Sequence, residues 1–385
     1  MKKNALAPET LAAQALRHID EATGSVVPPM LATSTFARDE NYELRDGYIY
    51  ARYSGPTTAH AEDIIATLED GDESLLFNSG MSASVAVVES LPPQAHVVAQ
   101  GMMYHIGTQW LQRQASRGVI ALDHFPAGDI DALAAQIQPG KTKLVWIETP
   151  ANGDWSITDI AAAAELAHAA GAVLMVDSTA APPCTQKPLD LGADISFHSA
   201  TKYMGGHSDF TAGVLSARAD LNLWTEIRDV RGFQGTILPA FEAWLLIRSL
   251  RTLHIRYAQC SRNAMRFATH FAAHKDVEAV LYPGMPTHTG HDVAAKQMKN
   301  GFGGMMSILI NGNAGRALEM AKKANLFIPA TSLGGVESLI EHRRTVAGPD
   351  SGIPENLLRM SIGIEHIDDL IADFEQALAT TSGHA

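Results

Sequence analysis

The chain has 385 residues, of which 46% are hydrophobic and 18% are charged, and its formal net charge is −13 at pH 7. A chain of this length suggests two domains, and it can bury a hydrophobic core without stabilising cross-links. This excludes a disordered chain, a collagen-like repeat and a disulfide scaffold. The negative charge argues against nucleic acid or an anionic membrane as the main partner, because both require a basic face.

Cysteine usage and hydropathy favour a cytoplasmic protein. The two cysteines, Cys184 and Cys260, match neither a disulfide framework nor the spacing of zinc ligands, and we expect no bound metal. The N-terminus lacks the apolar segment of a signal peptide. The longest stretch without Asp, Glu, Lys or Arg, residues 90–112, contains Pro92, Pro93 and four glutamines, so it is too polar and too broken to span a bilayer.

Between residues 57 and 217, short apolar runs alternate with longer segments of helical periodicity. Strands are predicted at residues 75–77, 95–98, 119–122, 143–147, 172–176, 195–197 and 213–215. Helices are predicted at residues 82–91, 104–115 and 158–170. Strands that alternate with helices of this length predict an α/β fold with a mostly parallel sheet covered on both faces.

The pattern changes in the C-terminal part. One long apolar-periodic helix is predicted over residues 241–274. Residues 305–310, 327–328 and 357–364 then alternate like antiparallel strands, flanked by helices at 314–324 and 368–379. We therefore expect three parts, listed in chain order: an N-terminal arm over residues 1–45, a larger α/β domain over 46–235 and a smaller α+β domain over 236–385.

The segment that carries chemistry follows a short predicted strand. There Lys202 stands between two hydroxyl residues, Ser199 and Thr201, and a pair of glycines. Asp177 ends an earlier strand, where open α/β sheets place their ligands. An amine that can join an aldehyde, hydroxyls for a phosphate and a buried acid for a ring nitrogen are the parts of a pyridoxal phosphate site. No P-loop, dinucleotide fingerprint or esterase elbow occurs in the chain.

At these residues the chain resembles the Cys/Met-metabolism family of pyridoxal-phosphate enzymes. That family includes the cystathionine β- and γ-lyases, cystathionine γ-synthase, methionine γ-lyase and the acyl-homoserine sulfhydrylases. The resemblance runs in order through nearly the whole chain. It implies the aspartate-aminotransferase-type fold (fold type I), the cofactor pyridoxal 5′-phosphate, a small amino-acid substrate and a homotetramer built from active dimers.

The resemblance assigns the cofactor site residue by residue. Lys202, in Ser-Ala-Thr-Lys-Tyr, matches the lysine that holds the cofactor, and Asp177, in Val-Asp-Ser-Thr, matches the acid on its ring nitrogen. Tyr104 matches the aromatic residue that stacks on the pyridine ring, and with Lys202 it is expected to be catalytic. The remaining cofactor contacts are expected from Ser199, Thr201, Gly80 and Met81 on the phosphate and from Asn152 near the phenolic oxygen.

Four further residues concern the neighbouring subunit and the substrate. Tyr50 and Arg52 match the pair that the family donates to the phosphate of a neighbouring subunit. Arg359, in Leu-Arg-Met-Ser, resembles the arginine that binds the substrate α-carboxylate, and Ser332 lies beside it in the family.

Several positions depart from the family pattern. Gly55 replaces an asparagine before Pro-Thr, and His105-Ile106 replaces a glycine pair after the stacking tyrosine. Thr331 matches neither the glutamate nor the aromatic residue that the family often has before the serine. Arg343 and Arg344 follow His342 where His-Pro is usual, so they serve an extra carboxylate on the substrate or a solvated rim.

The substrate class stays open on this evidence. We favour a carbon–sulfur lyase that acts by α,β- or α,γ-elimination on cystathionine or a cysteine-like amino acid. One alternative is γ-replacement on an activated homoserine, as in a cystathionine γ-synthase or homoserine sulfhydrylase. Another class of reaction on the same fold is transamination. A cofactor-binding remnant that serves as an interaction module is disfavoured by the intact lysine, aspartate and arginine set.

Overall fold

The computed structural model describes residues 6–348 and 352–381. Its larger part is built on a seven-stranded sheet in the spatial order β1-β7-β6-β5-β4-β2-β3. Neighbouring strands are parallel except where β7 pairs with β1 and with β6, so the predicted mostly parallel α/β sheet is confirmed. The strands are β1 (Glu73–Phe77), β2 (His96–Gln100), β3 (Ala121–Phe125), β4 (Thr142–Glu148), β5 (Val173–Asp177), β6 (Ile195–His198) and β7 (Gly213–Ala217).

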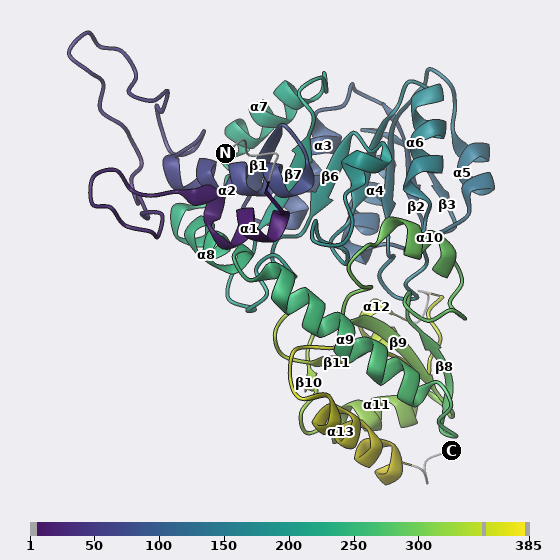
Figure 1. The fold of residues 1–385 in the computed structure, drawn as a ribbon. Coiled ribbons are helices and arrows are strands. Elements are labelled where there is room, and N and C mark those ends of the chain that lie inside the picture. The colour runs from purple at the N-terminus through teal and green to yellow at the C-terminus, as the bar shows by residue number, and fades with distance from the viewer. Residues whose placement is uncertain (1–5, 349–351, 382–385) are drawn as a thin grey trace.

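Helices cover both faces of this sheet (Figure 1). In β2, Val97 and Ala99 pack into one hydrophobic cluster with α3, α4 and α7, whereas Val98 packs into another with α5 and α6. Successive side chains of a strand point to opposite faces, so a strand covered on both faces needs a continuous apolar run. The helices are α2 (Pro56–Glu69), α3 (Gly80–Glu89), α4 (His105–Ser116), α5 (Ile130–Gln136), α6 (Ile160–Ala169), η3 (Pro188–Leu191) and α7 (Trp224–Gln234).

A second sheet of five strands, in the order β10-β11-β12-β9-β8, forms the C-terminal part. Its neighbours are antiparallel except β10 and β11, which are parallel. Its core includes four buried phenylalanines that pack ring against ring, Phe267, Phe271, Phe327 and Phe374. The elements are α8 (Ala240–Leu250), α9 (Leu253–Phe271), β8 (Val277–Leu281), α10 (His291–Gln297), β9 (Met305–Ile310), α11 (Ala314–Lys323), β10 (Ile328–Pro329), β11 (Leu339–His342), α12 (Arg343–Ala347), β12 (Leu357–Ser361) and α13 (Ile367–Thr380).

The single helix predicted over residues 241–274 is wrong, because the chain forms two helices, α8 and α9, separated by a turn. Side chains stabilise this break: Arg256 Nη2 and Thr252 Oγ1 donate to the Ser249 carbonyl over 2.9 and 3.3 Å. Helix α8 shares a hydrophobic cluster with α2 of the larger part, whereas α9 continues to the C-terminal sheet. The domain boundary at residue 236 stays a prediction.

The N-terminal arm first packs Ala12 and Ala15 into the hydrophobic cluster of α2 and α8, and it then loops away from the body of the molecule (Figure 1). It contains a short helix, α1 (Pro8–Ala13), and a 3-10 turn, η2 (Ala15–Arg17), which the sequence pattern did not indicate. Beyond them, isolated bridges join Thr35 to Tyr50 and Arg38 to Leu44. None of the helices within residues 6–348 and 352–381 has both the length and the apolar character needed to cross a membrane.

Candidate active site

A pocket at the carboxyl edge of the large sheet collects most of the predicted site residues. It is lined by the ends of β4, β5 and β6, by the starts of α3 and α4, and by C-terminal residues that reach it from the second sheet. The carboxyl ends of parallel strands are where open α/β sheets bind ligands. The predicted residues that line the pocket are Gly80, Met81, Tyr104, Asn152, Asp177, Ser199, Thr201, Lys202, Ser332 and Arg359.

Lys202 projects into this pocket from the loop between β6 and β7. Its Nζ donates to Ser332 Oγ over 3.0 Å. Burial lowers the pKa of the Lys202 ammonium, and Arg359 lowers it further while Glu341 opposes the shift. A lysine with a lowered pKa carries a free lone pair at neutral pH more often, so it can add to an aldehyde or accept a proton.

Asp177 ends β5 in the floor of the pocket and is 6% exposed. Burial raises the pKa of its carboxyl group to about 6, although the Thr179 hydrogen bonds and His198 oppose the shift. A protonated ring nitrogen beside Asp177 would supply a positive charge to this buried acid and bring its pKa down again. The acid thus fits the ring end of pyridoxal phosphate.

Sequence reasoning missed Glu148, which lines the same pocket and pairs in register with Asp177. Its carboxylate accepts the backbone N–H of Tyr104 at 2.6 Å and that of Asn152 at 2.5 Å. Glu148 therefore orients the two residues expected on the cofactor ring. Its place before Thr149-Pro150, at the end of a predicted strand like that of Asp177, was the available signal.

The start of α3 also lines the pocket. The Ser79 side chain caps this helix by accepting the N–H of Ser82, while the N–H groups of its first turn have no acceptor inside the helix. A Cβ on Gly80 would lie 3.0 Å from Cβ and Oγ of Ser199, so only glycine leaves space between the helix end and that hydroxyl. This helix end and its flanking hydroxyls fit a phosphate group.

Two threonines complete this end of the pocket. Thr179 accepts the N–H of Ser199 and donates its own N–H to Asp177, both over 2.9 Å, so it links the acid to the predicted phosphate site. Sequence reasoning did not single out Thr179. The Thr201 hydroxyl donates to the Ala212 carbonyl over 3.1 Å and must turn away from it to donate to a phosphate.

The C-terminal residues that line the pocket include two arginines, Arg343 and Arg359. Arg359 donates to the Ser332 carbonyl over 3.1 Å and to Asn152 Oδ1 over 3.2 Å. Its Nη2 also lies 3.0 Å from Oε2 of Glu341, an acid that sequence reasoning missed. The side chain of Arg343 is 3% exposed, so the solvated-rim interpretation of this residue is wrong.

Tyr50 and Arg52 lie outside the pocket of their own chain. Arg52 Nη1 donates to the Gly232 carbonyl over 2.8 Å, and its guanidinium packs over the ring of Tyr53. Tyr50 is 43% exposed. Their predicted role on the phosphate of a neighbouring subunit stays a prediction.

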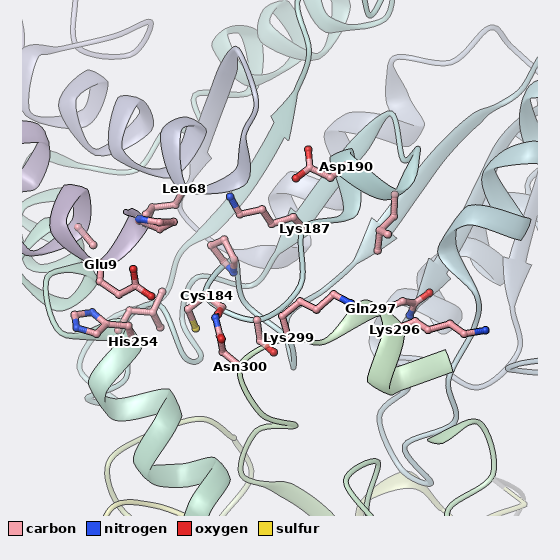
Figure 2. A pocket seen from close by; sticks show the side chains of 16 residues that line it. Glu9, Leu68, Cys184, Lys187, Asp190, His254, Lys296, Gln297, Lys299 and Asn300 are labelled. Atoms are coloured by element: carbon pink, nitrogen blue, oxygen red, sulfur yellow. The ribbon is translucent and has the colours of Figure 1, made fainter. Parts of the chain in front are cut away.

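A second pocket lies where the N-terminal helix, the start of α9 and the loops around Cys184 and Lys299 meet (Figure 2). Lys187 at its edge pairs with Asp70 of the α2 C-cap. None of the predicted site residues lines it.

The chain is similar to known proteins over nearly its whole length. The family described as Cys/Met metabolism PLP-dependent enzyme matches residues 9–379. The chain is 42% identical to a cystathionine gamma-synthase of Mycobacterium tuberculosis over 96% of each chain, and 36% identical to a cystathionine gamma-lyase of Dictyostelium discoideum over 93% and 94%.

A solved structure of cystathionine gamma synthase from Xanthomonas oryzae pv. oryzae, in complex with cystathionine, is 36% identical. It superimposes with a TM-score of 0.93 over 99% of this chain and all of that chain. The expected fold, the cofactor pyridoxal phosphate and the family resemblance are confirmed. The chain belongs to the Cys/Met metabolism family of PLP-dependent enzymes.

Proposed function

We propose that this PLP-dependent enzyme is a carbon–sulfur lyase of sulfur amino-acid metabolism. It removes a sulfur leaving group by α,β- or α,γ-elimination from cystathionine or a cysteine-like amino acid. The proposal rests on the position of Ser332, whose hydroxyl contacts Lys202 and whose carbonyl contacts Arg359. An α-carboxylate bound by Arg359 therefore brings the substrate α-carbon close to the Lys202 amine.

The residues of the pocket have different roles in the elimination. Pyridoxal phosphate, when bound, accepts the electron pair that the substrate α-carbon releases. Lys202 takes the α-proton, because its lowered pKa leaves the amine free to accept it. Asp177 holds a proton at the ring nitrogen, and Glu148 keeps Tyr104 and Asn152 in place through their backbone N–H groups. The leaving group then departs from the β- or γ-carbon.

γ-Replacement on an activated homoserine is the second candidate. Two of the relatives named above are cystathionine gamma-synthases, and one of these was solved with cystathionine bound. Cystathionine is the product of replacement and a substrate of elimination, so both candidates need a pocket that holds it. Transamination is a third reaction on this fold, and it predicts keto-acid exchange without release of ammonia or thiol.

We further propose that the enzyme works in the cytoplasm as a homotetramer whose active dimers share Tyr50 and Arg52. Large apolar side chains are exposed along the N-terminal arm, in the segment between the arm and α2, and on the helices α7 and α8, which supports burial of this surface by another subunit. They are Val26, Val27, Met30, Leu31, Tyr42, Ile49, Tyr50, Tyr53, Phe233 and Phe241.

A substrate panel tests the proposed function. The holoenzyme is incubated with cystathionine, cysteine, methionine or acylated homoserines, each with and without added cysteine. Ammonia, keto acid and thiol are assayed separately. The lyase predicts equimolar ammonia and keto acid from a sulfur substrate without an acceptor. Turnover only when cysteine and an acylated homoserine are both present identifies the replacement reaction, and keto-acid exchange alone identifies a transaminase.

A further inference from the structure

The substrate end of the pocket holds two buried guanidinium groups around one carboxylate. Oε2 of Glu341 lies 3.1 Å from Arg343 Nη1 and 3.0 Å from Arg359 Nη2. Its Oε1 accepts the Thr331 hydroxyl at 2.6 Å. The exposed fractions of the three charged side chains are 3–5%. Two positive charges therefore share one negative charge where water has little access.

The excess charge falls on Arg343. Arg359 is expected to bind the substrate α-carboxylate, whereas the buried Nε of Arg343 has no hydrogen-bond partner. Its Nη2 lies 3.3 Å from Nδ1 of His105, a ring kept neutral because burial and Arg343 lower its pKa. The nearby Glu148 does not balance Arg343, because burial raises the pKa of that carboxyl group to about 8. A buried guanidinium with free donors is costly unless an anion binds it.

We infer that Arg343, with His105 beside it, binds an anionic group at the far end of the substrate side chain while Arg359 holds the α-carboxylate. The inference rests on the proposed function and narrows its substrate class to amino acids whose side chain ends in a carboxylate. The planar fork of arginine suits such a group better than a point charge does. Amino acids with a neutral side-chain end gain nothing from Arg343.

If Arg343 had only a structural role, its loss would affect ligand binding in a different way. If Arg343 served only to hold Glu341, its loss would weaken all amino acids alike, because Glu341 acts on the shared α-carboxylate site through Arg359. A specificity residue changes the ratio between anionic and neutral ligands. That ratio separates the two roles.

The test uses two unreactive amino acids of equal chain length, L-2-aminoadipate and L-norleucine, which differ in the charge of the side-chain end. Their binding to the holoenzyme is measured by isothermal titration calorimetry. We expect wild type to prefer aminoadipate, Arg343→Gln to lower that preference by about 10- to 100-fold, and Arg343→Lys to retain part of it. Arg344→Gln removes the same charge one residue later, at a side chain outside the pocket, and should leave the preference unchanged.

Equal binding of the two ligands by wild type, or binding of neither, would overturn the inference. So would an Arg343→Gln variant that weakens both alike. A turnover arm compares O-succinyl-L-homoserine with the neutral O-acetyl-L-homoserine. If the enzyme prefers aminoadipate but turns over no substrate of the panel, the proposed function is wrong and the inferred anion site is supported. If the enzyme turns over substrates of the panel without any preference for an anionic side-chain end, the proposed function is supported and the inferred anion site is wrong.

Discussion

Glu148 and Asp177 lie opposite each other on neighbouring strands at the carboxyl edge of the large sheet, and each is 6% exposed. Burial raises the pKa of both carboxyl groups, and the charge of Asp177 raises that of Glu148 further. Two buried carboxylates on paired strand positions ionise together only at a large cost. The cofactor-free enzyme therefore retains a proton in this pair at neutral pH.

From the raised pKa values of this pair we predict how the stability of the cofactor-free enzyme depends on pH. The pKa of Glu148 rises from 4.5 to about 8 on folding, and that of Asp177 from 3.8 to about 6. The folded state thus binds protons that the unfolded chain releases, and the stabilisation present below pH 4 is lost as pH rises towards 8. Thermal unfolding followed by circular dichroism should show a falling Tm across that window.

Glu148→Gln provides the control for the pH dependence. The amide cannot titrate, so the slope of Tm against pH should become flatter even if the variant is less stable at every pH. A slope equal to that of wild type would show that Glu148 does not titrate in this window. Adding pyridoxal phosphate should also flatten the wild-type slope, because a protonated ring nitrogen favours ionised Asp177.

Replacing Lys202 with alanine should remove covalent attachment of the cofactor and nearly all turnover. The variant loses both the amine that joins the aldehyde and the base near the α-carbon, and we expect turnover to fall by about 1000-fold or more. Visible absorbance and mass spectrometry after borohydride reduction measure attachment. Lys299→Ala, a change at an exposed lysine of the second pocket, should keep both properties. Turnover retained by Lys202→Ala would exclude the lysine from catalysis.

Gly80→Ala should weaken cofactor binding. The added Cβ would lie 3.0 Å from Cβ and Oγ of Ser199 and would push that hydroxyl from the phosphate site. Loss of one such hydrogen bond weakens affinity by about tenfold, measured by titrating the cofactor-free protein. Gly315→Ala, also in the first turn of a helix but outside the pocket, should bind the cofactor as wild type does. If Gly80→Ala binds the cofactor with unchanged affinity, the phosphate does not bind at this helix end.

Mixing Arg52→Ala with Lys202→Ala subunits should restore activity that neither variant has alone. Arg52 lies outside the pocket of its own chain and contacts Gly232 there. If it serves a neighbouring subunit, a hybrid dimer regains one site with both residues intact. Native mass spectrometry verifies subunit exchange. Verified exchange without any recovery would show that Arg52 acts elsewhere.

Local sequence patterns predicted much of the fold and the cofactor end of the site. Strand β9 spans 305–310 as expected, and most predicted strands of the large sheet agree within a few residues. Such runs are readable because burial on both faces demands consecutive apolar residues. Helix α2 was not predicted, although Pro56 at its first position was a helix-start signal.

Local residue patterns were enough to predict the strands of the large sheet and the Lys202 and Asp177 motifs, because each depends on one short segment. Three-dimensional packing was needed to show that Ser332 joins Lys202 to Arg359, that Glu148 holds Tyr104 and Asn152, and that Arg343 is buried against Glu341. These contacts link residues up to 130 positions apart, as for Lys202 and Ser332, or depend on burial. Side-chain charge balance in a pocket follows from packing rather than from local periodicity.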